Sequence, residues 1–329
     1  MSRSISHELL KIRNLDVRFI QSGRDAHALR GLDLTLLSSE IHALVGESGS
    51  GKTVTSMSIM GLVPTPPGQV DADVLRFQGR DLRGLSYGEM RKIRGKEIAM
   101  VFQEPSKYLN PSLKTGQQIV EMLMLHQQMK KQPAIEKTLS FLEVVGLGEN
   151  KRVLNSYPHE LSGGMKQRAM IAMAICCNPA LLIADEPTTA LDVTLQLQIL
   201  NLIRNLKRQF SMGILFISHN LGLVREIADR ISVIYGGKIV ESAATRALFK
   251  NTLHPYTQAL LQSIPDVGKR GKRLQAIPGT VPDAENIPKG CSFHPRCSLA
   301  KDQCRLEIPK TIDYGFGHFA ACHMIGLHA

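Results

Sequence analysis

Residues 46–53 read Gly-Glu-Ser-Gly-Ser-Gly-Lys-Thr, and this stretch decides the fold of the 329-residue chain. It matches the pattern G-x-x-x-x-G-K-S/T, with an apolar run at 42–45 before it and a helical pattern through Met60 after it. A strand, a glycine-rich turn and a helix in this order point backbone N–H groups at a phosphate. Lys52 would reach phosphate oxygens, and Thr53 would offer a hydroxyl to Mg²⁺. The stretch therefore predicts a nucleotide site.

A second apolar strand is predicted at residues 181–186, which read Leu-Leu-Ile-Ala-Asp-Glu. Open parallel sheets place ligand chemistry at the carboxyl ends of their strands. We therefore expect Asp185 to hold Mg²⁺ and Glu186 to orient or deprotonate the water that attacks the γ-phosphate. Taken alone, the two acids could merely begin a turn at Pro187. The phosphate-binding loop favours the catalytic interpretation.

The remaining pattern predicts an α/β fold. Apolar and polar residues alternate over 9–37, which indicates antiparallel strands, and helical spacing over 105–157 indicates a helical insertion. We then expect helices at 163–177, 191–209 and 221–229, alternating with strands at 180–184, 214–218 and 231–235. Strands separated by helices favour a mainly parallel sheet with right-handed crossovers.

Composition indicates a globular protein of two domains, with 43% hydrophobic and 21% charged residues. The longest apolar run, 169–177, falls short of the roughly 20 residues of a membrane-spanning helix, and the N-terminus lacks the apolar core of a signal peptide. We therefore expect a cytosolic chain. The net charge of +11 fits nucleic acid, an anionic membrane face or solubility alone, whereas 5% aromatic residues and no Trp argue against a base-stacking protein.

The helix before the acidic strand opens with Leu-Ser-Gly-Gly-Met at 161–165, where Ser162 is a natural N-cap. These residues resemble the LSGGQ signature of the ABC ATPase superfamily, except that Met165 replaces glutamine. Three further motifs extend the resemblance over residues 9–250. They are Gln103 in MVFQEP as the Q-loop glutamine, Thr-Ala-Leu-Asp at 189–192 as the D-loop, and His219 in FISHN as the switch histidine.

The resemblance implies an ABC-type P-loop NTPase with an antiparallel β subdomain, a helical subdomain at about 105–165 and a small Cys-rich C-terminal extension. It also implies an ATP site shared between two subunits. One subunit would hold ATP and Mg²⁺ through Gly46, Ser48, Gly49, Ser50, Gly51, Lys52, Thr53, Gln103, Asp185, Glu186 and His219.

Within that site, the resemblance assigns Mg²⁺ to Thr53, Gln103 and Asp185. It assigns catalysis to Glu186, His219 and Gln103. The partner's ATP would be bound by Ser162, Gly163 and Gly164, and Asp192 of the D-loop also counts as nucleotide-binding.

Phe19 lies where the family keeps an aromatic residue that stacks on adenine. It fits a core position on the strand face of Leu15 and Val17 equally well. Both interpretations stay open.

Four of the six cysteines lie in the last 39 residues, at Cys291, Cys297, Cys304 and Cys322. Disulfides are disfavoured in the cytosol, so a cluster of this kind favours a metal site. Thiolates suit zinc and iron–sulfur equally, and the absence of C-x2-C pairs favours iron–sulfur. The alternatives are four unligated thiols, or zinc with histidine ligands drawn from His294, His318 and His323.

The C-terminal part carries a second resemblance. HPYTQALL at 254–261, Pro-Gly at 278–279 and the stretch 291–297 are similar to the C-terminal extension of ATPase subunits in the peptide and nickel uptake subfamily, where four cysteines are associated with a 4Fe-4S cluster. Prolines concentrate after Phe249, and the basic stretch 268–273 predicts a linker. We expect an ABC ATPase domain at 1–250 and an oligopeptide-transporter-type extension with a four-cysteine metal site at 251–329.

The two resemblances together imply an ATP-hydrolysing subunit of an ABC importer for peptides, with ATP, Mg²⁺ and a 4Fe-4S cluster as cofactors. It would sit peripherally on the cytoplasmic face of the inner membrane. Its partners would be a second, homologous ATPase in a heterodimer, two transmembrane permeases that contact residues 104–110, and indirectly a substrate-binding protein.

Two alternatives remain. The same machinery could import nickel or another small solute. A soluble ABC ATPase acting on nucleic acid or ribosomes is more distant, because the chain has a single ATPase unit and no coiled-coil arms; we expect no nucleic-acid partner.

Overall fold

The computed structural model describes residues 7–21, 23–189, 191–264 and 277–325. The predicted linker at 268–273 lies outside these residues. The chain forms two compact units, each assembled from separate stretches of sequence. Of the described residues, unit 1 comprises those within 1–9, 37–40 and 84–217, and unit 2 comprises those within 10–36, 41–83 and 218–329.

Unit 2 contains a sheet of short and long strands in the order β2-β1-β5-β6, with β4 also paired to β1. The strands are β1 (Glu8–Gln21), β2 (Arg24–Leu37), β4 (Gly68–Asp71), β5 (Val74–Phe77) and β6 (Arg80–Asp81). Both β4 and β5 pair antiparallel with β1. The buried face of β1 changes from even to odd positions at Asn14, whose φ is +50°. The alternation predicted over 9–37 is therefore real and is interrupted by one residue.

A second set of strands in unit 2 has the order β12-β13-β11-β10-β3. The wholly buried β3 (Ile41–Val45) runs parallel to β10 (Arg230–Tyr235), which pairs antiparallel with β11 (Lys238–Ala244). The last two strands, β12 (Ile312–Asp313) and β13 (Phe319–Ala320), come from the end of the chain and extend this set past β11.

Five α-helices accompany these strands in the described part of unit 2. They are α1 (Lys52–Ile59), α9 (Leu221–Ile227), α10 (Thr245–Lys250), α11 (Pro255–Gln262) and α12 (Asp302–Leu306). Helix α9 packs on β3 and on α11, and α10 packs on β10 and β11. The phosphate-binding loop and the C-terminal region thus belong to one unit.

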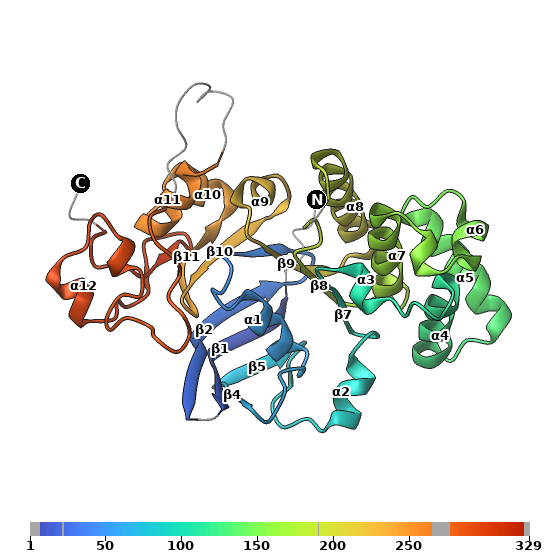
Figure 1. Cartoon of the computed structure of the whole chain (residues 1–329), viewed down its shortest axis with the longest axis horizontal. Helices are drawn as coiled ribbons and strands as arrows, with labels where there is room; N and C mark the ends of the chain where they lie inside the picture. The colour runs from blue at the N-terminus through green and yellow to red at the C-terminus, as the bar shows by residue number, and fades with distance from the viewer. Residues whose placement is uncertain (1–6, 22, 190, 265–276, 326–329) are drawn as a thin grey trace. The chain divides into compact units, whose positions relative to one another are not determined.

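Unit 1 is built on three parallel strands, β7 (Ile98–Val101), β8 (Leu181–Asp185) and β9 (Gly213–Ser218). All their residues are buried, as expected of strands covered on both faces. The helices are α2 (Tyr87–Ile93), α3 (Pro105–Tyr108), α4 (Thr115–Gln127), α5 (Lys131–Val144), α6 (Asn150–Asn155), α7 (Gly163–Ile175) and α8 (Val193–Phe210). Helices α4 to α7, drawn in greens in Figure 1, pack against one another. The predicted helical insertion is therefore present.

None of the described helices is long and apolar enough to cross a lipid bilayer.

Candidate nucleotide site

The phosphate-binding loop connects β3 to α1 in unit 2. A Cβ atom on Gly46 would lie 2.3 Å from the carbonyl oxygen of Ile234, so only glycine lets the loop leave β3 at this point. Gly51 is the N-cap of α1 with a φ of +108°, a left-handed conformation that glycine adopts without strain. These two glycines bring the backbone to the open N-terminus of α1, where N–H groups can meet an anion.

Lys52 is buried at the start of α1, and its ammonium lies over the loop. Its Nζ donates hydrogen bonds to the carbonyl oxygens of Gly46 (2.9 Å) and Glu47 (3.0 Å). The buried Oγ of Ser50 has no hydrogen-bond partner among the described residues, whereas Thr53 is exposed at the same end of α1. A buried cation, an unsatisfied hydroxyl and an exposed hydroxyl fit a polyphosphate with its Mg²⁺.

The C-terminal region contacts this loop through Glu47. The guanidinium of Arg296 donates to both carboxylate oxygens, from Nη1 to Oε2 at 2.8 Å and from Nη2 to Oε1 at 3.0 Å. The main-chain N–H of Glu47 donates to the hydroxyl of Tyr256 at 3.0 Å. We did not predict these three residues as part of the site. In the sequence, the HPY motif that contains Tyr256 indicates only a resemblance to the subfamily.

Glu186 and Gln103 come together in unit 1, at the carboxyl ends of β8 and β7. Gln103 Nε2 donates to Glu186 Oε2 at 3.2 Å, and Thr189 Oγ1 donates to the same oxygen at 3.0 Å. Glu186 has a φ of +45°, which is unusual for a residue with a side chain, and its N–H donates to the Ile217 carbonyl at 3.0 Å. The backbone bend turns the chain directly after the buried Asp185. Two predicted site residues thus share a hydrogen bond.

The predicted signature residues open α7 in the same unit. Ser162 caps the helix, and its Oγ accepts the N–H of Met165 at 3.3 Å. Gly163 is exposed, and a Cβ atom there would face open space. Gly164 is buried against Leu195 of α8. At the first turn of α7, Gly163 therefore presents uncovered backbone.

Asp192 has a local role that the motif did not predict. It is the N-cap of α8, and its carboxylate accepts the N–H of Leu195 at 2.9 Å. A capping bond of this kind fixes where the helix starts. Its predicted role in nucleotide binding stays a prediction.

His219 and Phe19 lie in unit 2. His219 is exposed directly after β9 and precedes Asn220, which caps α9 by accepting the N–H groups of Gly222 and Leu223. Phe19 is half-buried on β1 and faces Gly68 of β4 across the sheet. Both roles stay predictions.

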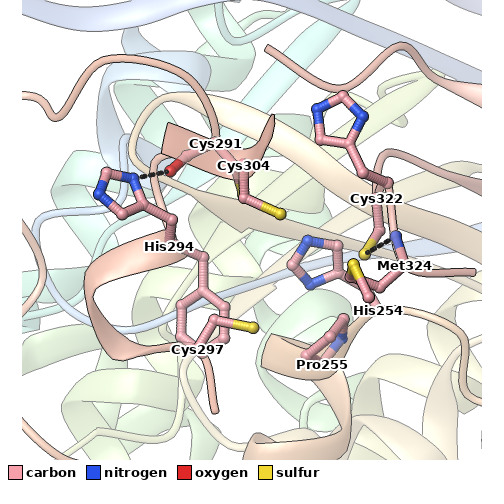
Figure 2. Close-up of a pocket in the computed structure, with 10 residues that line it drawn as sticks. His254, Pro255, Cys291, His294, Cys297, Cys304, Cys322 and Met324 are labelled. Carbon is pink, nitrogen blue, oxygen red and sulfur yellow. Dashed lines mark hydrogen bonds between the residues drawn. The ribbon is translucent and has the colours of Figure 1, made fainter. Parts of the chain in front are cut away.

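The four C-terminal cysteines line one pocket in unit 2, shown in Figure 2. The lining residues are His254, Pro255, Cys291, Phe293, His294, Cys297, Cys304, Cys322, His323 and Met324. Among the residues that the structure describes, however, no three or more His, Cys, Asp and Glu side chains form a group that could hold a metal ion. The predicted 4Fe-4S cluster on Cys291, Cys297, Cys304 and Cys322 is therefore wrong, and so is the zinc alternative.

Local packing gives the physical reason for this correction. Pro255, Phe293 and Met324 add apolar surface to the pocket, and the sulfur of Cys322 accepts the N–H of Met324 at 3.3 Å (Figure 2). Burial raises the pKa of Cys291 to about 11, which disfavours the thiolate form at this position. Metal ligation needs the thiolate. None of the six cysteines forms a disulfide bond in the structure.

Each histidine named as a substitute ligand has one ring nitrogen in a polar contact with another residue of the chain. His318 forms a buried 2.8 Å pair with Glu241, which also accepts the N–H groups at 253 and 254. His294 Nδ1 lies 2.9 Å from the Cys291 carbonyl oxygen, and His323 Nε2 lies 3.1 Å from the carbonyl of Glu307. These contacts hold the C-terminal region to β11 and to itself.

Two family models match this chain. One is described as "ABC transporter" and covers residues 29–189; the other is described as "Oligopeptide/dipeptide transporter, C-terminal region" and covers residues 240–304. The chain is similar to the oligopeptide transport ATP-binding protein AppD of Bacillus subtilis (strain 168), with 45% identity over 96% of each chain. It is also similar to the dipeptide transport ATP-binding protein DppD of Escherichia coli (strain K12), with 44% identity over 96% of each chain.

Solved structures of similar fold include a dimeric bacterial ABC transporter cassette, with a TM-score of 0.65 and 26% identity over 72% of this chain and 99% of that one. A dimeric cassette in a post-hydrolysis state, bound to ADP and Pi, matches with a TM-score of 0.64 and 27% identity over the same shares.

Proposed function

This chain belongs to the ABC transporter ATP-binding family, and on that premise we propose that it is the ATP-hydrolysing subunit of a peptide importer. The observation that carries the proposal is that one chain matches both the ABC cassette and the C-terminal region of oligopeptide and dipeptide transporters. Relatives named as peptide transport ATP-binding proteins match along nearly its whole length. The family predicted from the sequence motifs is thereby confirmed.

The phosphate groups of ATP would be bound by the N–H groups of residues 46–53 and by the ammonium of Lys52. Both features lie at the N-terminus of α1, where an anion would be bound favourably. Thr53, Gln103 and Asp185 supply hydroxyl, amide and carboxylate oxygens, which are the ligands that Mg²⁺ prefers. When bound, Mg²⁺ neutralises charge on the phosphates.

Glu186 would hold and orient the attacking water with its carboxylate. The hydrogen bonds from Gln103 and Thr189 to one carboxylate oxygen restrict its rotation, which supports a positioning role. His219 would assist from the end of β9, and Phe19 would stack on adenine. These roles would position the reactants and stabilise the developing charge, which are the main requirements of catalysed phosphoryl transfer.

A second ATPase subunit would complete the site. Ser162, Gly163 and Gly164 would act on the nucleotide of the partner subunit, with Asp192 at the same interface. The exposed backbone of Gly163 supports this proposal, as do the two similar cassettes solved as dimers. We propose a homologous, different chain as the partner.

The chain would bind peripherally to two transmembrane permeases at the cytoplasmic face of the membrane and would act indirectly with a substrate-binding protein. Residues 104–110 support a permease contact, because α3 is exposed here and Tyr108 is fixed against Phe102 with ring centroids 3.9 Å apart. We propose the division into an ATPase domain at 1–250 and a Cys-rich extension at 251–329.

Uptake of labelled di- and oligopeptides tests the function. In cells that lack this chain, uptake is expected to fall, and the wild-type chain should restore it whereas Lys52→Ala should not, because the variant loses the cation at the phosphates. Lys92→Ala, which changes an exposed lysine of α2, is the matched control and should restore uptake fully. Peptide uptake that is unchanged in cells without the chain would contradict the proposal.

A further inference from the structure

Glu47 places a carboxylate inside the phosphate-binding loop. It follows Gly46 and is the only acidic residue between 46 and 53. A carboxylate in this position repels a polyphosphate unless its charge is compensated. The loop therefore needs a counter-ion for Glu47 if it is to bind ATP well.

Arg296 supplies this counter-ion from 249 residues further along the chain. The pair is bidentate, with N–O distances of 2.8 and 3.0 Å. Only 5% of the Arg296 side-chain surface and 30% of that of Glu47 is exposed. Paired, planar and shielded from water in this way, the two charges interact more strongly than an ordinary surface ion pair.

The guanidinium is itself held from other directions. Arg296 Nε donates to the carbonyl oxygen of Pro278 at 2.7 Å, and Nη1 donates to the hydroxyl of Tyr235 at 3.3 Å. The guanidinium carbon also lies 5.8 Å from the centre of the Tyr235 ring. Tyr235 ends β10 and is fully buried, so Arg296 is anchored to the sheet that carries the loop.

Tyr256 fixes the main chain of the same loop residue. Its hydroxyl accepts the N–H of Glu47 at 3.0 Å, and its ring meets Tyr235 edge to face with centroids 4.6 Å apart. His254 caps α11 by accepting the N–H of Tyr256 through Nδ1 at 3.0 Å. The C-terminal region thus holds Glu47 by both its side chain and its backbone.

We propose that Arg296 is a positioning residue for ATP binding, which neutralises Glu47 and turns its carboxylate toward the C-terminal region. This inference rests on ATP binding at the loop, as in the proposed function. It makes the C-terminal region a contributor to the nucleotide site rather than a separate attachment. The effect is electrostatic, so it should be larger for ATP than for the less charged ADP, and it should weaken as salt concentration rises.

The test is the affinity of the purified full-length chain for Mg-ATP and for ADP, measured by calorimetric titration. Arg296→Met is expected to raise the Kd for ATP roughly tenfold, and the Kd for ADP by less, because the charge of Glu47 is left uncompensated in the loop. Glu47→Gln combined with Arg296→Met should return the Kd for ATP to within about threefold of wild type, since the repelling charge is gone. Arg296→Lys keeps the positive charge but lacks the planar guanidinium, so its Kd for ATP should lie between those of the wild type and Arg296→Met.

Arg305→Met is the matched control, because Arg305 belongs to the same C-terminal region and its side chain is exposed. It should leave the Kd for ATP unchanged. Circular dichroism and thermal unfolding without nucleotide establish that each variant is folded.

Two results would overturn the proposal. One is a folded Arg296→Met variant with wild-type affinity for ATP. The other is a double variant that binds ATP as weakly as Arg296→Met, since a purely structural support would not be relieved by Glu47→Gln. If Arg296→Met does not fold, the Kd for ATP of the single variant Glu47→Gln decides. A Kd equal to or below that of the wild type supports the counter-ion role, and a Kd raised more than about threefold refutes it. Failure of the wild-type chain to bind ATP would instead refute the proposed function.

Discussion

Glu186 occupies a conformation that side chains usually avoid, with a φ of +45°. Such a backbone costs about 1–3 kcal/mol and persists only where surrounding contacts enforce it. Here the enforcing contacts are the bond of its N–H to Ile217 and the two bonds that its carboxylate accepts from Gln103 and Thr189. These contacts fix the carboxylate at the end of the parallel strands.

Glu186→Gln is expected to lower ATP turnover by about a hundred- to ten-thousand-fold, because the amide cannot take up a proton from water. ATP binding should persist, since the amide keeps a similar shape. Phosphate release under saturating ATP measures the effect, with Glu143→Gln at an exposed position of α5 as the matched control. Turnover within a few-fold of wild type would remove Glu186 from the mechanism.

Residues such as Lys52, Asp185 and Glu186 could be predicted from the sequence because their chemistry depends on neighbours in the chain. A glycine-rich turn and an acidic strand end are local patterns. Arg296 and Glu47 carry no such pattern, because tertiary folding alone brings them together. The prediction of a metal site at the C-terminal cysteines failed for a related reason. Their spacing indicates the type and number of ligands but not the directions of the side chains.

Two of the motif residues predicted to bind nucleotide also begin helices. Ser162 and Asp192 both cap helices, α7 and α8, besides their predicted contact with nucleotide. Caps of this kind satisfy N–H groups that have no partner within the helix. Each of these two side chains thus stabilises the start of the helix on which its predicted nucleotide-binding position lies.

Asp192→Ala is expected to lower the free energy of unfolding by about 1 kcal/mol, the usual loss for a helix cap. Asp192→Asn should retain most of the stability, because its side-chain oxygen still accepts the N–H of Leu195. Urea unfolding followed by circular dichroism gives both values. Equal stability of the wild type and Asp192→Ala would mean that the cap adds nothing to the fold.

Fully buried strands of five or more residues and long amphipathic helices could be predicted from the sequence, whereas strands of two to four residues could not. Strand β8 and helix α8 agree with their predicted ranges to within about two residues. Strands β4, β5 and β6 have at most four residues each, too few for alternation to emerge. Strands β12 and β13 have two residues each and form only because β11 offers an edge.

At the scale of the whole molecule, the predicted site residues divide between the two units. Unit 2 carries the phosphate-binding loop and His219, and unit 1 carries Gln103, Asp185, Glu186 and the start of α7.

Unit 2 also contains two wholly buried histidines, His42 and His254. Burial lowers the pKa of each to about 3.

These histidines make stability depend on pH. Below the ordinary pKa of about 6.5 the unfolded chain binds a proton at each site, whereas the folded chain stays neutral until about pH 3, so folding loses stability as the pH falls through this window. Each histidine contributes a slope that approaches about 1.4 kcal/mol per pH unit. Guanidinium unfolding at pH 7, 6 and 5 should show a smaller slope for His42→Gln than for the wild type.

The pairing of β13 with β11 has a consequence for solubility. Without it, β11 would present a row of unpaired N–H and carbonyl groups to which a strand of another molecule could add. Residues near the end of the chain occupy that edge through pairs with Glu241 and Ser242 and through the bond from Ala321 to Val240. The strand that then lies outermost, β12, is only two residues long and offers little template for aggregation. The C-terminal region therefore protects the sheet from edge-to-edge association between copies of the chain.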